Sequence, residues 1–253
     1  MRILALDTTT RSGSVALWDG RLIEERTGDP GKSHAERLPG DLVDLLTAHG
    51  WRVGDVERYA VASGPGSFTG MRVGIATIQG LALVQNRLVA PISALEALAH
   101  EAARRPEAEP GAFVAGWMDA YRGEVFGALY RVAAAAPPAD EGLRPRGSAT
   151  LELVDDASVG APAVLADRWR ARLGGARLIV AGDGVGRTRS LLDERFSPLL
   201  VAIEPAAIAG TLAALAAADP ARAVRPHAIV PLYVRRPDAE LARDRAQAPA
   251  APS

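Results

Sequence analysis

One run of small residues directs the fold of the first half of the chain. The run reads Ser63-Gly64-Pro65-Gly66-Ser67-Phe68-Thr69-Gly70. Apolar residues 59–62 before it predict a short strand, and the apolar residues that recur through 67–85 predict a helix capped by Ser67. A strand, a glycine-rich loop and a helix start in this order leave backbone amides free to hold an anion.

The run allows two interpretations that its residues alone leave open. It lacks the Gly-Lys-Ser/Thr ending of a P-loop, so the lysine that reaches terminal phosphates is missing. In one interpretation the amides still bind an anion or a nucleotide, together with the polar turn that begins at Asp7. In the other, Pro65 fixes a structural elbow at a partner surface, and Asp7 only holds its own turn. The candidate anion-binding residues are Asp7, Thr8, Thr9, Gly64, Gly66, Ser67, Thr69 and Gly70.

Regular strand and helix patterns lie on the N-terminal side of the run. Strands are predicted over residues 2–6, 14–18 and 21–26. Short polar turns join these strands, which favours an antiparallel meander. A leucine stripe at helical spacing follows over 33–49, where Ser33 and Glu36 have the spacing of a capping box and Gly50 ends the helix.

The C-terminal side repeats the theme of strand, polar turn and strand. The predicted elements are a strand over 88–92, a helix from 93 to about 104, strands over 113–118, 124–131 and 178–181, and a helix over 205–218. A segment rich in Pro and acidic residues, 107–111, marks a boundary. We therefore predict one lobe over 1–105 and a smaller lobe over 106–235. Residues 236–253 are rich in Ala, Pro and charge and are predicted to be disordered.

Composition and charge exclude several classes of protein. The 253 residues include 29 Lys and Arg against 30 Asp and Glu, a balance that disfavours a protein binding nucleic acid on its own. The sequence has no cysteine, which excludes disulfides, thiolate catalysis and cysteine-ligated metals. Its four histidines are not spaced as a helical metal-binding pair, and it has no Gly-x-Ser-x-Gly elbow, so we expect no hydrolytic site. Without a signal-peptide layout or a long apolar span, we expect a soluble, cytoplasmic protein.

Two predicted helices of the first lobe carry more apolar surface than one sheet covers. The helix over 67–85 is apolar almost all round, and Gly70, Gly74, Ala76 and Gly80 would let another helix approach closely. Ordinary core packing explains a leucine stripe equally well, so the alternatives are core and interface. The candidate partner-binding residues are Ser33, His34, Leu38, Leu42, Leu45, Ser67, Phe68, Met71, Arg72, Ile75 and Ile78.

Several stretches together resemble one family, the TsaB proteins. They are the opening residues 3–9 with 14–17, the segment 33–38, the glycine-rich run extended to Gly74, the turn 119–125 and the segment 231–235. The resemblance implies an α/β fold of two related actin-like (ASKHA, RNase H-like) lobes, each a mixed sheet flanked by helices. It also implies a non-catalytic subunit that helps a sister protein to install threonylcarbamoyl on adenosine in tRNA.

The resemblance further implies the partners. These are a TsaD-type catalytic subunit, bound through the two first-lobe helices, and a TsaE-type ATPase. ATP or ADP and a metal are expected in those subunits, with none in the isolated chain, and tRNA is contacted only indirectly. A homodimer of the isolated chain would use the same helical patch and compete with the TsaD-type subunit. In the second lobe, the polar cluster of Asp119, Arg122 and Glu124 contacts a partner or tRNA, or braces its own hairpin.

Two alternatives from other functional classes stay open. The first is a small-molecule kinase or ATPase with an actin-like fold that acts alone, which predicts magnesium-dependent ATP binding that is lost on Asp7→Ala. The second is a homodimeric scaffold, which predicts a dimer that ignores TsaD-type proteins.

Overall fold

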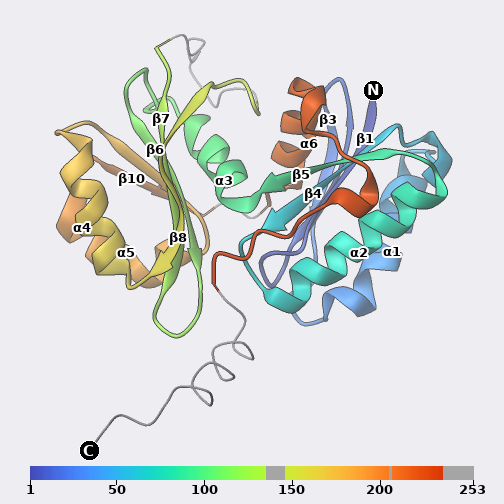
Figure 1. Cartoon of the computed structure of the whole chain (residues 1–253), viewed down its shortest axis with the longest axis horizontal. Coiled ribbons are helices and arrows are strands. Elements are labelled where there is room, and N and C mark those ends of the chain that lie inside the picture. Colours follow the sequence, from blue (N-terminus) through green and yellow to red (C-terminus); the bar gives the residue numbers. More distant parts are fainter. Residues whose placement is uncertain (135–145, 205–206, 236–253) are drawn as a thin grey trace, which may run out of the picture.

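The computed structural model describes residues 1–134, 146–204 and 207–235, and the tail predicted to be disordered, 236–253, lies outside this range. Within it the chain forms two five-stranded sheets, each flanked by helices (Figure 1). Among the described residues, no helix combines the length and the apolarity needed to cross a bilayer.

The first sheet has the strand order β3-β2-β1-β4-β5. Its strands are β1 (Arg2–Asp7), β2 (Ser14–Asp19), β3 (Leu22–Thr27), β4 (Arg58–Gly64) and β5 (Leu88–Ser93). The first three pair antiparallel, which confirms the predicted meander, and β4 and β5 continue the sheet parallel to β1. Because side chains alternate along a strand, the buried strands β1, β2, β4 and β5 each supply two hydrophobic layers, one on each face of the sheet.

The second sheet has the order β10-β9-β6-β7-β8. Its strands are β6 (Phe113–Asp119), β7 (Val125–Val132), β8 (Leu151–Gly160), β9 (Leu178–Ala181) and β10 (Leu200–Ile203). β6, β7 and β8 pair antiparallel, while β9 and β10 run parallel to β6, so this sheet repeats the plan of the first. Two related lobes with mixed sheets are the expected actin-like α/β fold.

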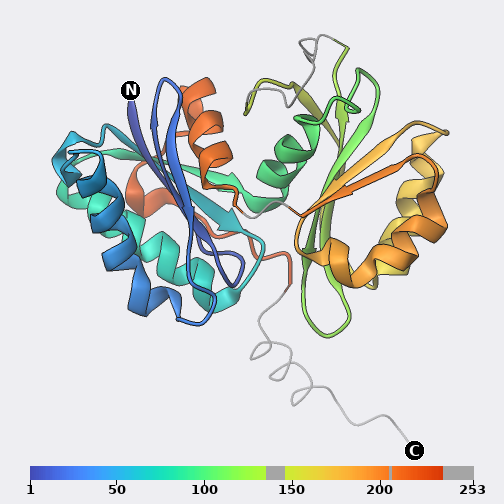
Figure 2. The ribbon, with the colours of Figure 1, turned by 180° about the vertical axis from the view of Figure 1, so that it is seen from behind.

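Helices cover both faces of each sheet (Figure 2). In the first lobe, α1 (His34–Ala48) and α2 (Phe68–Val84) cover the outer face and α6 (Ala209–Ala218) the inner face. In the second, α3 (Ala94–Ala103) covers the inner face, and α4 (Pro162–Leu173) and α5 (Gly184–Phe196) cover the outer one. Short 3₁₀ turns are η1 (Val53–Asp55), η2 (Pro220–Arg222) and η3 (Pro226–Ala228).

Helix starts follow the caps that the sequence indicated. Ser33 forms a capping box with Glu36 at the start of α1, which satisfies two of the amides that a helix start leaves without partners. Ser67 accepts a hydrogen bond from the backbone N–H of Gly70 at 3.1 Å, and Ser93 caps α3 in the same way. The predictions for the starts of these three helices are therefore confirmed.

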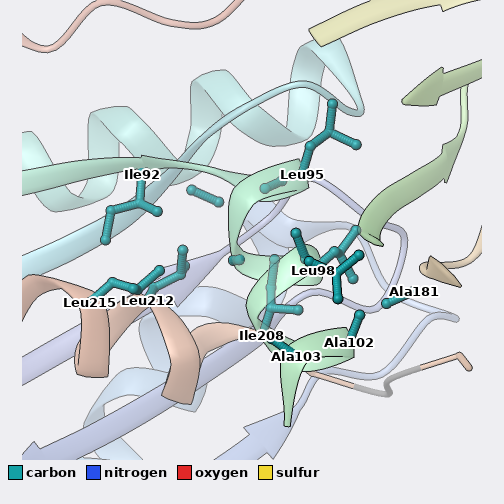
Figure 3. Packing of buried hydrophobic residues seen from close by; sticks show 14 of the residues in the cluster. Ile92, Leu95, Leu98, Ala102, Ala103, Ala181, Ile208, Leu212 and Leu215 are labelled. Carbon is teal, nitrogen blue, oxygen red and sulfur yellow. The ribbon is translucent and has the colours of Figure 1, made fainter. Parts of the chain in front are cut away.

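One continuous core joins the two lobes. Side chains from β5, α3, β9 and α6 meet in it (Figure 3), and they include Ile92, Leu95, Leu98, Ala102, Ala103, Ala181, Ile208, Leu212 and Leu215. α6 follows the second sheet in the chain but packs on the first sheet. The division at 105 and 235 stays a prediction, and it did not anticipate this return of the chain to the first lobe.

Four elements of the second lobe had no predicted counterpart. They are β8, α4, α5 and β10. The predicted helix over 205–218 begins later, because α6 starts at Ala209 and residues 205–206 lie outside the described range.

A buried histidine on α3 should make the fold sensitive to acid. His100 is 6% exposed, its Nδ1 has no hydrogen-bond partner, and burial lowers its pKa to about 4. The unfolded chain takes up this proton below about pH 6.5, whereas the folded chain resists it until about pH 4, so stability is lost as the pH falls through this window. Between pH 7 and pH 5, the free energy of unfolding should therefore fall by about 2 kcal/mol less in His100→Leu than in the native chain. Urea titrations of both proteins at the two pH values measure this difference, and equal losses in both would contradict the prediction.

Candidate functional site

The glycine-rich run is an elbow that lies directly against the turn between β1 and β2. Gly66 has a φ of +154°, and a Cβ at this position would lie 2.4 Å from the carbonyl oxygen of Thr9. The backbone N–H of Ser67 donates to the same oxygen at 2.8 Å. Glycine is therefore required here both by the backbone conformation and by the close approach of the two loops.

The next two glycines of α2 continue this contact. A Cβ at Gly70 would lie 2.3 Å from the carbonyl oxygen of Thr8, and one at Gly74 would lie 2.1 Å from Thr8 Oγ1. These small residues thus let α2 pack on its own lobe and are not available to a partner helix. Ala76 and Gly80, the two other small residues predicted to let a helix approach, are exposed.

Asp7 is bonded within its own turn. Its Oδ1 accepts hydrogen bonds from the backbone N–H of Thr9 at 2.8 Å and from Thr9 Oγ1 at 2.6 Å. Asp7 is 3% exposed, and burial raises its pKa. This is the local geometry of an Asx turn, which supports the structural interpretation of the residue.

The pocket between the lobes is acidic. It has a volume of about 330 Å³, and its lining includes Asp7, Asp183 and Glu204 against one cation, Arg11. Asp183 accepts a hydrogen bond from the backbone N–H of Asp119 at 3.0 Å, and burial raises its pKa. Three carboxylates beside one guanidinium would repel phosphate groups that carry no metal ion. Within the described ranges, no cluster of three or more acidic or histidine side chains is arranged to hold a metal ion.

A second pocket, of about 340 Å³, opens where α1 and α2 begin. It brings together five predicted site residues from the two candidate sets: Ser33, His34, Ser67, Thr69 and Gly70. Its charged lining residues are Arg11 and Lys32, with no carboxylate among the residues that line it. The exposed ring of Tyr121 from the second lobe also lines it, although no pattern in the sequence indicated a role for this residue.

His34 is held in a neutral form at the edge of this pocket. Its Nε2 lies 2.9 Å from the carbonyl oxygen of Thr10, and its Nδ1 lies 2.8 Å from a guanidinium nitrogen of Arg37. Arg37 donates to Nδ1, so the remaining proton sits on Nε2 and points to Thr10. Burial is the main reason that the pKa of His34 lies below its ordinary value.

The predicted partner-binding residues separate into buried and exposed groups. Six of them form part of the first lobe's own core: Leu38, Leu42, Leu45, Met71, Ile75 and Ile78. These side chains contact this chain, as the core interpretation of the leucine stripe requires, so they do not present a surface to a partner. Ser33, Phe68 and Arg72 remain exposed.

The exposed face of α2 is a stripe of apolar and small residues that includes one charged residue, Arg72. It runs along the helix through Phe68, Arg72, Ala76, Gly80, Leu83 and Val84. The side chains of Leu83 and Val84 are 63% and 84% exposed, and a Cβ at Gly80 would meet nothing within 4 Å. We call this stripe the α2 face.

The C-terminal segment, residues 231–235, closes over the start of the α2 face. The backbone N–H of Leu232 donates to the carbonyl oxygen of Ser63 at 2.7 Å. Arg72 Nε donates to the hydroxyl of Tyr233 at 3.0 Å, while the guanidinium lies 3.8 Å from the ring centroid of Phe68. The two aromatic rings are 5.5 Å apart. Arg72 is therefore stacked and hydrogen-bonded within the chain.

The same segment reaches the second lobe through Arg235. Its guanidinium donates to the carbonyl oxygen of Ala120 at 2.7 Å and forms an ion pair with Glu124. Asp119, the other acid of the predicted polar cluster, pairs with Arg187 at 2.7 Å and accepts from the backbone N–H of Tyr121 at 2.9 Å. These bonds brace the turn between β6 and β7.

The third residue of that cluster, Arg122, has a φ of +56°, next to Tyr121 at +58°. Two consecutive left-handed residues are costly, and the bonds around Asp119 hold them in place. The roles of Arg187 and Arg235 were missed in the sequence, because contacts between residues so far apart in the chain leave no local pattern.

Comparison with known proteins gives consistent matches. Residues 29–139 match the family model described as TsaD, tRNA N6-adenosine threonylcarbamoyltransferase. The Escherichia coli protein named tRNA threonylcarbamoyladenosine biosynthesis protein TsaB is 38% identical over 52% of this chain and 55% of its own length. An uncharacterised protein of Mycobacterium leprae is 30% identical over 94% of this chain and 56% of its own length. The chain thus spans about half the length of these curated relatives.

Solved structures match over nearly the whole chain. A Pseudomonas aeruginosa protein described as similar to peptidase YeaZ is 32% identical, with a TM-score of 0.71, and the match covers 92% of this chain and 99% of that one. A structure described as YeaZ from the same organism is 30% identical, with a TM-score of 0.68 and the same coverage.

Proposed function

The chain belongs to the TsaB family, and from this membership we propose that it acts in the formation of threonylcarbamoyladenosine in tRNA. Its part in this process is that of a non-catalytic subunit, which binds and stabilises a TsaD-type catalytic subunit. The names of the E. coli and Haemophilus influenzae relatives support the process. The division of roles rests on the α2 face and on the acidic pocket between the lobes.

The α2 face is the observation that carries the proposal. It exposes Leu83 and Val84 beside the small residues Ala76 and Gly80, which would let a second helix approach closely. The partner is argued from the family match, because α1 and α2 lie in the part of the chain that matches the TsaD model. A TsaD-type protein would therefore present a related helix pair, and two related helix pairs can pack around a pseudo-twofold axis. A second copy of this chain would dock on the same face.

The acidic pocket between the lobes supports assigning the nucleotide to other subunits. Asp7, Asp183 and Glu204 would repel the phosphates of metal-free ATP, and Asp7 is already bonded to Thr9. In this proposal a TsaD-type subunit and a TsaE-type ATPase hold the nucleotide and the metal. A kinase acting alone would instead show magnesium-dependent ATP binding by the isolated chain.

Size-exclusion chromatography with light scattering, on the chain alone and mixed with the TsaD-type protein of the same cell, tests the proposal. We expect a homodimer that converts to a stoichiometric hetero-complex. Gly80→Glu should weaken this complex by about a hundredfold or more, since it places an unpaired charge in the contact. The same change should leave the isolated chain folded, because nothing lies within 4 Å of the new Cβ and Glu favours helix more than Gly does.

Val164→Glu on α4 is the matched control. It introduces the same charge at a residue that is 63% exposed in the second lobe, so the complex should form normally. A chain that stays a homodimer in the mixture would favour the scaffold alternative and contradict the subunit proposal. Equal binding by the Gly80→Glu variant and the native chain would place the contact elsewhere.

A further inference from the structure

A small basic pocket lies at the C-terminal end of α2, where Leu83 of the α2 face forms part of its lining. It has a volume of about 110 Å³, and its lining includes Asn86, Arg87, Arg225 and His227. This is well below the roughly 300–1,000 Å³ of pockets that enclose a whole small molecule. Its size therefore suits a small ion or one group of a larger ligand.

The positive charge of this pocket is not neutralised by the chain. Among the described carboxylates, none forms an ion pair with Arg87, Arg225 or His227, and none lines the pocket. The neighbouring Arg222, by contrast, pairs with Glu96 at 2.8 Å. In a chain with a net charge of −1, such a local excess of cations is attractive to an anion.

One donor of Arg87 lacks a hydrogen-bond partner, and this residue is not needed to cap α2. Its Nε is buried without a hydrogen-bond partner. A basic residue after a helix often serves the last carbonyls of that helix. Here the carbonyl oxygens of Leu81, Ala82 and Leu83 already accept from the backbone N–H groups of the three residues that follow α2, so the guanidinium is not needed for this purpose.

A second unsatisfied group lies nearby. The hydroxyl of Tyr59 is buried without a hydrogen-bond partner. Tyr59 lies on β4 and pairs with Val89 of β5, two residues after Arg87 in the chain. Burial raises the pKa of Tyr59, and the positive charge of Arg87 partly opposes this rise. Tyr59 does not line the pocket, so the unsatisfied Nε of Arg87 is the donor beside the pocket that lacks an acceptor.

The backbone holds the pocket in a fixed shape. Val89 and Val224 form an isolated antiparallel bridge, with N–H to O distances of 2.9 and 2.8 Å. Gln79 on α2 donates to the carbonyl oxygen of Pro226 at 2.8 Å. These bonds tie the segment that carries Arg225 and His227 to the loop that carries Arg87, so the backbone positions of the three residues are fixed relative to one another before a ligand binds.

We propose that Arg87, Arg225 and His227 form a binding site for one phosphate group. Guanidinium groups bind phosphate through parallel N–H···O bonds, and the imidazole adds a further donor. The phosphate could belong to an RNA backbone or to a free phosphate-bearing ligand. The assignment of the phosphate to RNA rests on the proposed function, whereas the proposal of a phosphate-binding site does not.

Inorganic phosphate, titrated into the full chain and followed by amide NMR, tests the site. We expect saturable shifts at Asn86, Arg87, Arg225 and His227, which disappear in the double variant Arg225→Gln/His227→Gln. Arg170→Gln removes a charge from an exposed arginine of α4 that forms no ion pair with the described residues, and it should leave the shifts unchanged. An absence of saturable shifts in the native chain, or their persistence in the double variant, would overturn the proposal.

Binding of tRNA by the complex with the TsaD-type subunit distinguishes the sources of the phosphate. If the site takes an RNA phosphate, the double variant should lower the slope of log affinity against log salt by about one, relative to Arg170→Gln. If the double variant leaves this salt slope unchanged while the native chain still shows saturable NMR shifts with inorganic phosphate, the site binds a free phosphate-bearing ligand and not RNA. Light scattering on the same samples shows whether the complex has formed, so a failure of the subunit proposal is recognised separately.

Discussion

Replacement of Arg146 by methionine is expected to lower the free energy of unfolding by about 3–5 kcal/mol, one of the two largest effects that we predict. Arg146 donates to Glu25 of β3 at 2.8 Å, and to Glu101 of α3 and Thr211 of α6 at 2.9 and 3.1 Å. The side chains of the two glutamates are 9% and 7% exposed. Without the guanidinium, two carboxylates would lie buried near each other with their main counter-charge gone. Chemical denaturation at pH 7 measures the loss.

Two controls separate this mechanism from a simple loss of packing. Burial raises the pKa of Glu25 even with Arg146 present, whereas at Glu101 the effect of burial is outweighed by Arg146, Thr211 and Arg104, and its pKa is lowered. Removal of Arg146 raises both pKa values, so the two glutamates take up protons more readily in the folded variant than in the unfolded chain. As the pH falls from 7 to 5, the variant's loss in free energy of unfolding, relative to the native chain, should therefore become smaller. Arg146→Met/Glu25→Gln should be less destabilised than the sum of the single changes. A deficit that is independent of pH would contradict this account.

Gly66→Ala is expected to cost about 3 kcal/mol, from one added methyl group. The new Cβ would lie 2.4 Å from the carbonyl oxygen and 2.6 Å from the Cβ of Thr9, at a φ that side chains rarely adopt. Overpacking and backbone strain each cost about 1–3 kcal/mol. The elbow cannot relax freely, because the N–H of Ser67 is bonded to the same carbonyl oxygen.

Gly80→Ala provides the comparison for this change. It adds the same methyl group to α2, where the Cβ has open space, and should stabilise the chain by about 0.5–1 kcal/mol. Thermal or urea unfolding of both variants gives the two values. A Gly66→Ala variant as stable as the native chain would show that the elbow and the β1–β2 turn can separate.

Sequence patterns predicted those strands and helix starts that depend on neighbouring residues in the chain. The strands of the first lobe and the starts of α1, α2 and α3 follow from apolar periodicity and from serine caps. α5 was missed because its first turn contains Gly184 and Gly186, which indicate a loop. The structure shows that a Cβ at Gly184 would lie 2.9 Å from the backbone of Met118, a tertiary demand without a local signal. β8 was missed because it is only partly buried.

The candidate site was harder to predict, because exposure depends on what covers each helix. Ile78 and Met71 fit a partner surface and a core equally well in sequence. The structure buries them, since the first sheet covers α2 from one side and Ile229, which follows η3, joins the same cluster. A segment about 150 residues away in the chain thus decides which residues of the helix are free.

The C-terminal segment has a mechanical consequence. Hinge closure around a ligand, as in kinases, requires that two lobes swing apart and together. Leu232 and Tyr233 are fastened to the first lobe, while Arg235 grips the turn of the second, so opening would break several bonds at once. The bonds of the C-terminal segment therefore oppose a hinge opening of the two lobes. In the proposed complex, a chain held in one arrangement would lose little conformational freedom on binding its partner.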